Sequence, residues 1–157
     1  MEERISIISL CDNGLLSIGA KRNELLSRAK AEYTCFIDDD DTISSTYIFH
    51  LAEGIGAGVD CCSLLGVYTV AGQDPELFEH SIKYHTWKTN PPTMGLRYER
   101  NPNHLNCIKS NIAKQFKFPE TWHGEDYDWS KQLQVSGLLK TEHYISDVIY
   151  HYQFKNK

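Results

Sequence analysis

The sequence has no apolar run that approaches the roughly 18 residues a membrane-spanning helix needs. Its N-terminus, MEERISIISL, carries acids where a secretory signal peptide carries basic residues. Internal repeats and low-complexity segments are also missing. We therefore expect a cytoplasmic protein with no membrane span and no export signal.

A basic excess, which domains that bind nucleic acid usually show, is absent as well. The chain has 16 Lys and Arg against 21 Asp and Glu, a net charge of −5. Four of those acids are consecutive, at residues 38–41, and the remaining 17 nearly balance the 16 bases. The acidity is therefore concentrated at one point, and we expect no nucleic-acid partner.

The five cysteines form no C-x-x-C pair, and their number is odd. Cys35, Cys61 and Cys62 lie inside apolar runs. This pattern predicts reduced, mostly buried thiols in a reducing compartment rather than a disulfide framework. The length of 157 residues allows one compact domain, which would bury roughly 70% of the surface of its unfolded chain.

Hydrophobic periodicity and turn residues predict an α/β fold. The expected strands are residues 4–10, 33–37, 59–70 and 77–85, with one or two more within 142–154. The expected helices are 17–30 after Ser17, about 45–53 after Ser44 or Ser45, 104–115, and 125–135 closed by Gly137. Residues 90–102 are expected to be loop-rich. The strand–helix–strand order of residues 4–37 is typical of a parallel βαβ unit, so we expect a mainly parallel central sheet flanked by helices, with a small antiparallel part.

The four aspartates at the end of an apolar strand are the strongest functional signal. Ligands of open α/β sheets bind beyond the carboxyl ends of strands. Adjacent carboxylates repel each other, and a divalent cation bridged to phosphate groups relieves that repulsion. Asp38 and Asp40 would face one site on an extended chain. The alternative is a solvated acidic turn that caps the next helix through Asp41.

Three further features each have a functional and a structural interpretation. Lys21 and Arg22 near a helix start suit a diphosphate, or form a solvated basic face. The acids of Gly124-Glu125-Asp126 suit a general base, or are helix-capping charges. The histidines His104 and His151 suit a ligand-binding site, or are structural.

Two short patterns do not occur in the structural context that their function requires, and a third pattern indicates an alternative enzyme class. Residues 54–59 look like a dinucleotide loop but lack the third glycine and follow a helix. Residues 38–43 lack the glycine of a calcium loop. The run Asp38-x-Asp40-x-Thr42 also fits the nucleophile motif of haloacid-dehalogenase-like Mg²⁺ phosphatases, although a complete strand and helix precede it here.

The segment from residue 19 to residue 41, GAKRNELLSRAKAEYTCFIDDDD, resembles the family 2 glycosyltransferases of the glycosyltransferase-A fold. Their pattern is G-x-x-R-N-x-x-L-x-x-A-x-G-E-Y-I-x-F-L-D-x-D-D. It is matched by Gly19, Arg22, Asn23, Leu26, Ala29, Glu32, Tyr33, Phe36 and the aspartates. Downstream, HGEDYDW resembles the acidic motif of the family, and His151 resembles a late histidine that often completes its metal site.

The resemblance implies a metal-dependent, inverting transferase that uses a nucleotide-diphosphate sugar, most often a uridine one, and Mn²⁺ or Mg²⁺. Asp40 would bind the metal, with Asp38 and His151 in support. Asp12, Lys21, Arg22, Asp38 and Asp39 would contact the nucleotide or diphosphate. The base that deprotonates the acceptor hydroxyl would be Asp126, with Glu125 as the alternative, and His104, Asn106 and Trp122 would surround the sugar and acceptor.

Members of that family carry a further strand and helix ahead of this segment, so we expect a reduced form of the fold in one domain over residues 1–157, either by natural reduction or because the sequence is a piece of a longer chain. Its nucleotide and metal part would cover about residues 1–70, and its acceptor and catalytic part about 71–157. A second copy of the chain would cover the exposed edge of the first strand. The phosphatase with Asp38 as nucleophile, and a non-catalytic domain that binds nucleotide sugars, are the alternatives.

Overall fold

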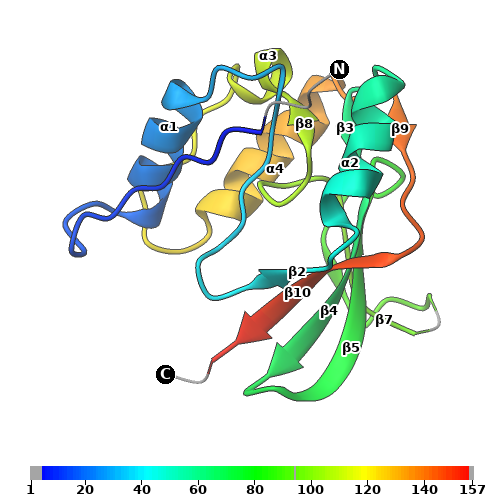
Figure 1. Ribbon diagram of the computed structural model, residues 1–157. Helices are drawn as coiled ribbons and strands as arrows, with labels where there is room; N and C mark the ends of the chain where they lie inside the picture. The colour runs from blue at the N-terminus through cyan, green and yellow to red at the C-terminus, as the bar shows by residue number, and fades with distance from the viewer. Residues whose placement is uncertain (1–4, 94, 156–157) are drawn as a thin grey trace.

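The computed structural model describes residues 5–93 and 95–155, which form two sheets and the helices around them (Figure 1). The smaller sheet has the order β1-β8-β3-β9, with strands Tyr33–Thr34, Ile108–Lys109, Cys61–Cys62 and Glu142–His143. The larger sheet has the order β2-β10-β4-β5-β7-β6. Its strands are Thr42–Ile43, Val148–Phe154, Leu64–Val70, Gln73–His80, Leu96–Arg100 and Lys88–Thr89.

The prediction of an α/β chain is confirmed, but the prediction of a mainly parallel sheet is wrong. Five of the eight strand pairings are antiparallel. Residues 5–10 form no strand, and Ile7 in that segment is 91% exposed. The expected βαβ unit is therefore missing, because β1 pairs with β8 in the antiparallel sense instead.

A tight hairpin accounts for much of the antiparallel character. Ala71 and Gly72, both with positive φ, join β4 to β5 directly. Two adjacent strands joined by so short a turn can only run antiparallel. β5 thus begins at Gln73, ahead of the strand expected at residues 77–85, and β7 lies inside residues 90–102, where we expected loops.

Two of the four expected helices are confirmed, and their ends lie at or near the expected residues. Helix α1, Ile18–Arg28, begins after Ser17, whose hydroxyl accepts a hydrogen bond from the Ala20 amide at 3.2 Å. Helix α4, Glu125–Ser136, lies between Gly124 and Gly137, both in the left-handed conformation. Figure 1 shows α1 and α4 on the same side of the molecule, where the two helices pack together.

The other two helices differ from expectation. Helix α2, Tyr47–Gly56, follows Thr46 rather than Ser44 or Ser45, and it continues past Gly54. Gly54 marks a close approach rather than a helix end, because a Cβ there would lie 2.5 Å from the Cys62 sulfur. The expected helix at 104–115 is reduced to α3, Ser110–Ala113. The Asn103 side chain accepts from the Leu105 amide, and this local bond holds the preceding segment in a turn.

Two apolar clusters form the core. One joins α2 to the large sheet, with Tyr47, Leu64 and Phe78 among its members, and the other packs Leu26 of α1 against Phe118 and Trp129. All five cysteines are free, and Cys61, Cys62 and Cys107 are buried as expected, whereas Cys11 is exposed. Among the described residues, no helix has the length and apolar character needed to cross a bilayer.

Candidate functional site

The candidate site is a cavity of about 360 Å³ between the N-terminal ends of α1 and α4 and one face of the large sheet. Its polar rim includes Arg22, Asp38, His104, Glu125 and Asp126. Its sheet wall is largely aromatic and is made by Tyr68, Phe78, His80, Tyr98, Arg100, Tyr152 and Phe154. This volume lies within the range of small-molecule sites.

A buried arginine organises the polar rim. Arg22, on the inner face of α1, is 8% exposed and bonds two carboxylates. Its two terminal nitrogens lie 2.5 Å from Glu125 Oε1 and 3.0 Å from Asp38 Oδ1. The guanidinium therefore ties α1, the start of α4 and the aspartate segment into one unit.

The second oxygen of Asp38 is also occupied. His104 Nε2 lies 3.3 Å from Asp38 Oδ2. Burial alone would raise the pKa of Asp38, but the His104 hydrogen bond and the charge of Arg22 outweigh it and lower that pKa. Asp38 thus stays ionised as a structural anion, and with both oxygens bonded it is poorly placed for the phosphatase nucleophile considered above.

The rest of the aspartate run forms a turn that is anchored to β10. The Asp41 amide donates to the Asp38 carbonyl at 3.1 Å. The Asp41 carboxylate accepts from the Tyr150 hydroxyl at 2.7 Å and from the Gln153 amide at 2.8 Å. Within residues 5–93 and 95–155, no hydrogen bond or ion pair engages the exposed side chains of Asp39 and Asp40. The two middle carboxylates are therefore presented to solvent on a fixed turn.

The two candidate bases differ sharply in their surroundings. Glu125 is 4% exposed and committed to Arg22, and burial raises its pKa although Arg22 opposes the shift. Asp126 lines the cavity, and its one described hydrogen bond comes from the adjacent Tyr127 amide at 2.9 Å. Asp126 is thus the carboxylate of the pair that remains available to a ligand.

Asp12 and Lys21 form a separate pair at the start of α1. Lys21 Nζ lies 2.9 Å from Asp12 Oδ1, and the Asp12 carboxylate also accepts from the Gly14 and Leu16 amides. The Leu16 hydrogen bond is the main cause that lowers the pKa of Asp12 to about 2. Neither residue lines the cavity, so their nucleotide-binding role stays a prediction.

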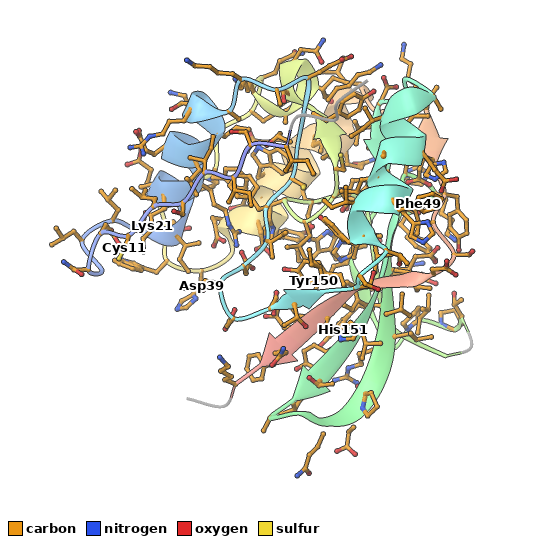
Figure 2. The ribbon with its side chains drawn as sticks, in the orientation of Figure 1. Cys11, Lys21, Asp39, Phe49, Tyr150 and His151 are labelled. Carbon is orange, nitrogen blue, oxygen red and sulfur yellow. The ribbon has the colours of Figure 1, made fainter. Side chains whose placement is uncertain are left out.

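The remaining predicted residues separate into lining and supporting positions. His104 and the half-exposed Trp122 line the cavity. Asn106 lies behind the wall, where its amide donates to the Cys62 carbonyl at 2.9 Å. Side-chain alternation along β10 places His151 on the face opposite Tyr150 and Tyr152. Figure 2 labels Tyr150 and His151 on this strand, with Asp39 on the turn.

The free carboxylates of the aspartate turn fit a divalent cation only where the substrate supplies further ligands. Among the residues described, no group of three or more His, Cys, Asp or Glu side chains could hold a metal ion. Mg²⁺, however, is commonly held by one or two carboxylates together with substrate phosphates. Asp39 and Asp40 fit a cation that is shared with a diphosphate, and a preformed site completed by His151 does not fit.

Sequence reasoning missed the sheet wall of the cavity. Tyr68 stacks with Tyr152 and meets Tyr98 edge to face, at centroid distances of 5.5 and 5.4 Å. Arg100 lies over the Trp87 and Tyr98 rings, and burial lowers its pKa. The alternating aromatics at positions 150, 152 and 154 were the available signal, since they mark the inward face of that strand.

A second, larger hollow of about 530 Å³ lies beside α3. It is lined by Lys30, Ala31, Glu32, Lys109, Ser110, Asn111 and Lys114. It has no network that connects carboxylates, arginine and histidine, so the cavity at the helix starts is the better candidate.

Comparison with known proteins supports the fold. No protein-family model and no curated protein matches the sequence. Among solved structures, the crystal structure of S. aureus TarS 1-349 is similar, with a TM-score of 0.59 and 16% sequence identity. The match covers 87% of this chain and 40% of the TarS chain, so this chain spans less than half of that neighbour. At this identity the likeness shows that the two chains share an α/β fold.

Proposed function

We propose that this chain is a glycosyltransferase that moves a sugar from a nucleotide-diphosphate sugar to an acceptor hydroxyl. The observation that carries the proposal is the arrangement at the cavity rim. Asp38 and the free Asp126 both line the cavity, and the turn that follows Asp38 presents the free carboxylates of Asp39 and Asp40 to solvent. The glycosyltransferase-like fold supports this assignment. The resemblance to family 2 makes a uridine diphosphate sugar the first donor to test.

The donor diphosphate would lie at the turn. The adjacent carboxylates of the run repel an anion, and the single positive charge of Arg22 is shared between Asp38 and Glu125. Mn²⁺ or Mg²⁺, held by Asp40 and Asp39, would offset the negative charge that develops on the departing diphosphate. Because the protein offers only part of a coordination shell, cation and nucleotide are expected to bind together.

Asp126 would act on the acceptor. Its carboxylate takes the proton of the acceptor hydroxyl as that oxygen bonds to the anomeric carbon. The bond between the anomeric carbon and the diphosphate oxygen breaks, and its electron pair leaves with the diphosphate. Attack from the side opposite the leaving group inverts the anomeric centre. Glu125, held by Arg22, positions the start of α4 and takes no proton.

Calorimetry with UDP tests the shared cation. We expect UDP to bind with Mn²⁺ present and to bind at least tenfold more weakly in EDTA, because the aspartate turn then repels the diphosphate. Asp40→Asn should cause the same loss with Mn²⁺ present. Asp74→Asn, which removes an equal charge at the β4–β5 hairpin, is the matched control and should bind as the parent does. Equal UDP affinity with and without the cation would refute the shared site.

Turnover tests the reaction itself. The parent should release UDP from at least one UDP-sugar when Mn²⁺ and saccharide acceptors are supplied. Tight UDP binding without release from any donor and acceptor would instead identify a binding domain. Phosphate release, with a covalent phosphate on Asp38, would identify the phosphatase.

A further inference from the structure

Three buried polar atoms without partners lie in the residues that line the cavity. Among the described residues, His80 Nε2, Asn103 Nδ2 and His104 Nδ1 are inaccessible to solvent and make no hydrogen bond. His80 is only 1% exposed, and Asn103 is fully buried. Buried polar groups without a partner are costly, and in native proteins they usually serve a ligand, an ion or ordered water.

The hydrogen bonds behind the wall define what His80 offers. Asn106 donates its amide to the Cys62 carbonyl, so its Oδ1 faces His80 and Asn103. That oxygen accepts from the Asn103 backbone amide at 3.0 Å and lies 3.2 Å from His80 Nδ1. Nδ1 must therefore carry the proton, which leaves a lone pair on Nε2. Burial, with the nearby charge of Arg100, lowers the pKa of His80, so the ring stays neutral.

The same network defines what Asn103 offers. Its Oδ1 accepts from the Leu105 amide at 3.0 Å, which fixes the orientation of the side-chain amide. Nδ2 is left with free N–H donors. His80 Nδ1 and the Asn103 backbone amide both bond the Asn106 oxygen, and both residues line the cavity, so the free acceptor and the free donor belong to neighbouring residues of one wall.

We infer that His80 and Asn103 form a subsite that binds hydroxyl groups of a sugar ring, an inference that rests on the proposed function. A hydroxyl both donates and accepts, so it can give its proton to His80 Nε2 and receive an N–H from Asn103. Phe78 and Tyr98 line the same wall and supply apolar surface for the C–H groups of a sugar ring. Asn106, predicted to contact the sugar, is instead the positioning residue behind both.

The subsite accounts for discrimination as well as binding. A wall built to hydrogen-bond a hydroxyl rejects an analogue that lacks it, because its buried polar atoms are then left without partners. The cavity rim binds charge and the inner wall binds neutral hydroxyls. We therefore expect UDP alone to leave the inner wall empty and the attached sugar to fill it.

The test compares UDP with UDP-glucose, UDP-galactose and UDP-N-acetylglucosamine in Mn²⁺. Asn103→Ser keeps an oxygen for the Leu105 amide but removes the N–H donors, and His80→Phe removes the acceptor. For the UDP-sugar that the parent prefers, we expect about tenfold weaker binding in each variant, with UDP binding changed less than twofold. His80→Gln, which can place an oxygen in the pocket, should restore part of the affinity. Asn111→Ser, at an exposed position of α3, is the matched control and should behave as the parent does.

Nitrogen NMR of the parent supplies a readout that does not depend on a folded variant. The resonances of His80 Nε2 and the Asn103 side-chain amide should move with the UDP-sugar and stay in place with UDP. Unmoved resonances, or variants that weaken UDP and UDP-sugars equally, would overturn the subsite and leave the glycosyltransferase proposal standing.

If the parent binds no nucleotide, methyl α-D-glucopyranoside distinguishes failure of the sugar subsite from failure of the proposed nucleotide-sugar function. Shifts of the same two resonances by this glycoside would support the sugar subsite and refute the nucleotide-sugar function. An absence of shifts with every probe would mean that ordered water alone satisfies these atoms, and the subsite would be refuted.

Discussion

Removing the guanidinium of Arg22 should be among the most damaging single changes to this chain. In Arg22→Met the apolar stem of the side chain remains, but the bonds to Glu125 and Asp38 are lost. Breaking a buried ion pair from one side typically costs 3–5 kcal/mol. Asp38 is partly exposed and keeps His104, so the cost falls mainly on Glu125. We therefore expect a loss of about 3 kcal/mol in the free energy of unfolding at pH 7.

This loss should appear as a fall in Tm of about 6–12 °C by scanning calorimetry, given 2–4 °C per kcal/mol for a domain of this size. Arg28→Met is the matched control on the same helix. Arg28 pairs with Glu24 at 2.7 Å, but the two side chains are 47% and 46% exposed. A surface pair of this kind contributes about 0–1 kcal/mol.

The pH dependence checks the cause. Burial already raises the pKa of Glu125, and losing Arg22 removes a charge that lowers it, so in Arg22→Met that pKa rises further. The native variant then binds more protons than the unfolded chain, and its stability increases as the pH falls toward 5. The difference from the parent should therefore narrow between pH 7 and pH 5, and Glu125→Gln added to Arg22→Met should recover stability at pH 7. Equal effects of Arg22→Met and Arg28→Met, or a difference that does not change with pH, would refute the reasoning.

Two further predictions concern catalysis and packing. Asp126→Asn should slow sugar transfer by about 10²- to 10⁴-fold while UDP affinity stays within twofold, and an equal rate in a UDP-release assay would contradict the assignment of the base. Gly19→Ala should lower Tm, because a Cβ there would lie 1.7 Å from the Pro119 carbonyl oxygen, where forced repacking costs about 1–3 kcal/mol. Gly56→Ala, with no atom within 4 Å of the added carbon, is its control, and equal melting of the two variants would show that α1 can move away.

Features with a local cause could be predicted from the sequence. Ser17 begins α1, and Gly137 ends α4, because capping depends on residues within one turn of the helix end. The turn that holds the aspartate run is also local, since its closing bond joins Asp41 to Asp38, but the extended segment expected there is wrong, and Asp41 bonds β10 rather than capping α2. The residues expected to carry chemistry at the start of each helix, Arg22 and Asp126, both line the cavity.

Local sequence patterns did not predict which strands pair when the strands lie far apart in the sequence. The run at residues 4–10 has strand-like composition, yet residues 5–10 pair with no neighbour in the described structure. β1 pairs with β8, more than 70 residues further along the chain, and this pairing decides its direction. The pairing also decides which face of β10 points into the cavity, so that Tyr152 lines the cavity and His151, next to it on the strand, does not.

The amino-acid sequence by itself determined the ends of α1 and α4 and the residue types of the rim, because each of these depends on interactions within a few residues. The tertiary structure alone decided that Arg22 holds Glu125 from 103 positions away, which commits one acid of the motif and leaves Asp126 free. It also brought His80 of β5 and Asn103 to the same Asn106 oxygen. Such pairings follow from burial and from the geometry of packed elements, and neither quantity can be read from the spacing of residues along a chain.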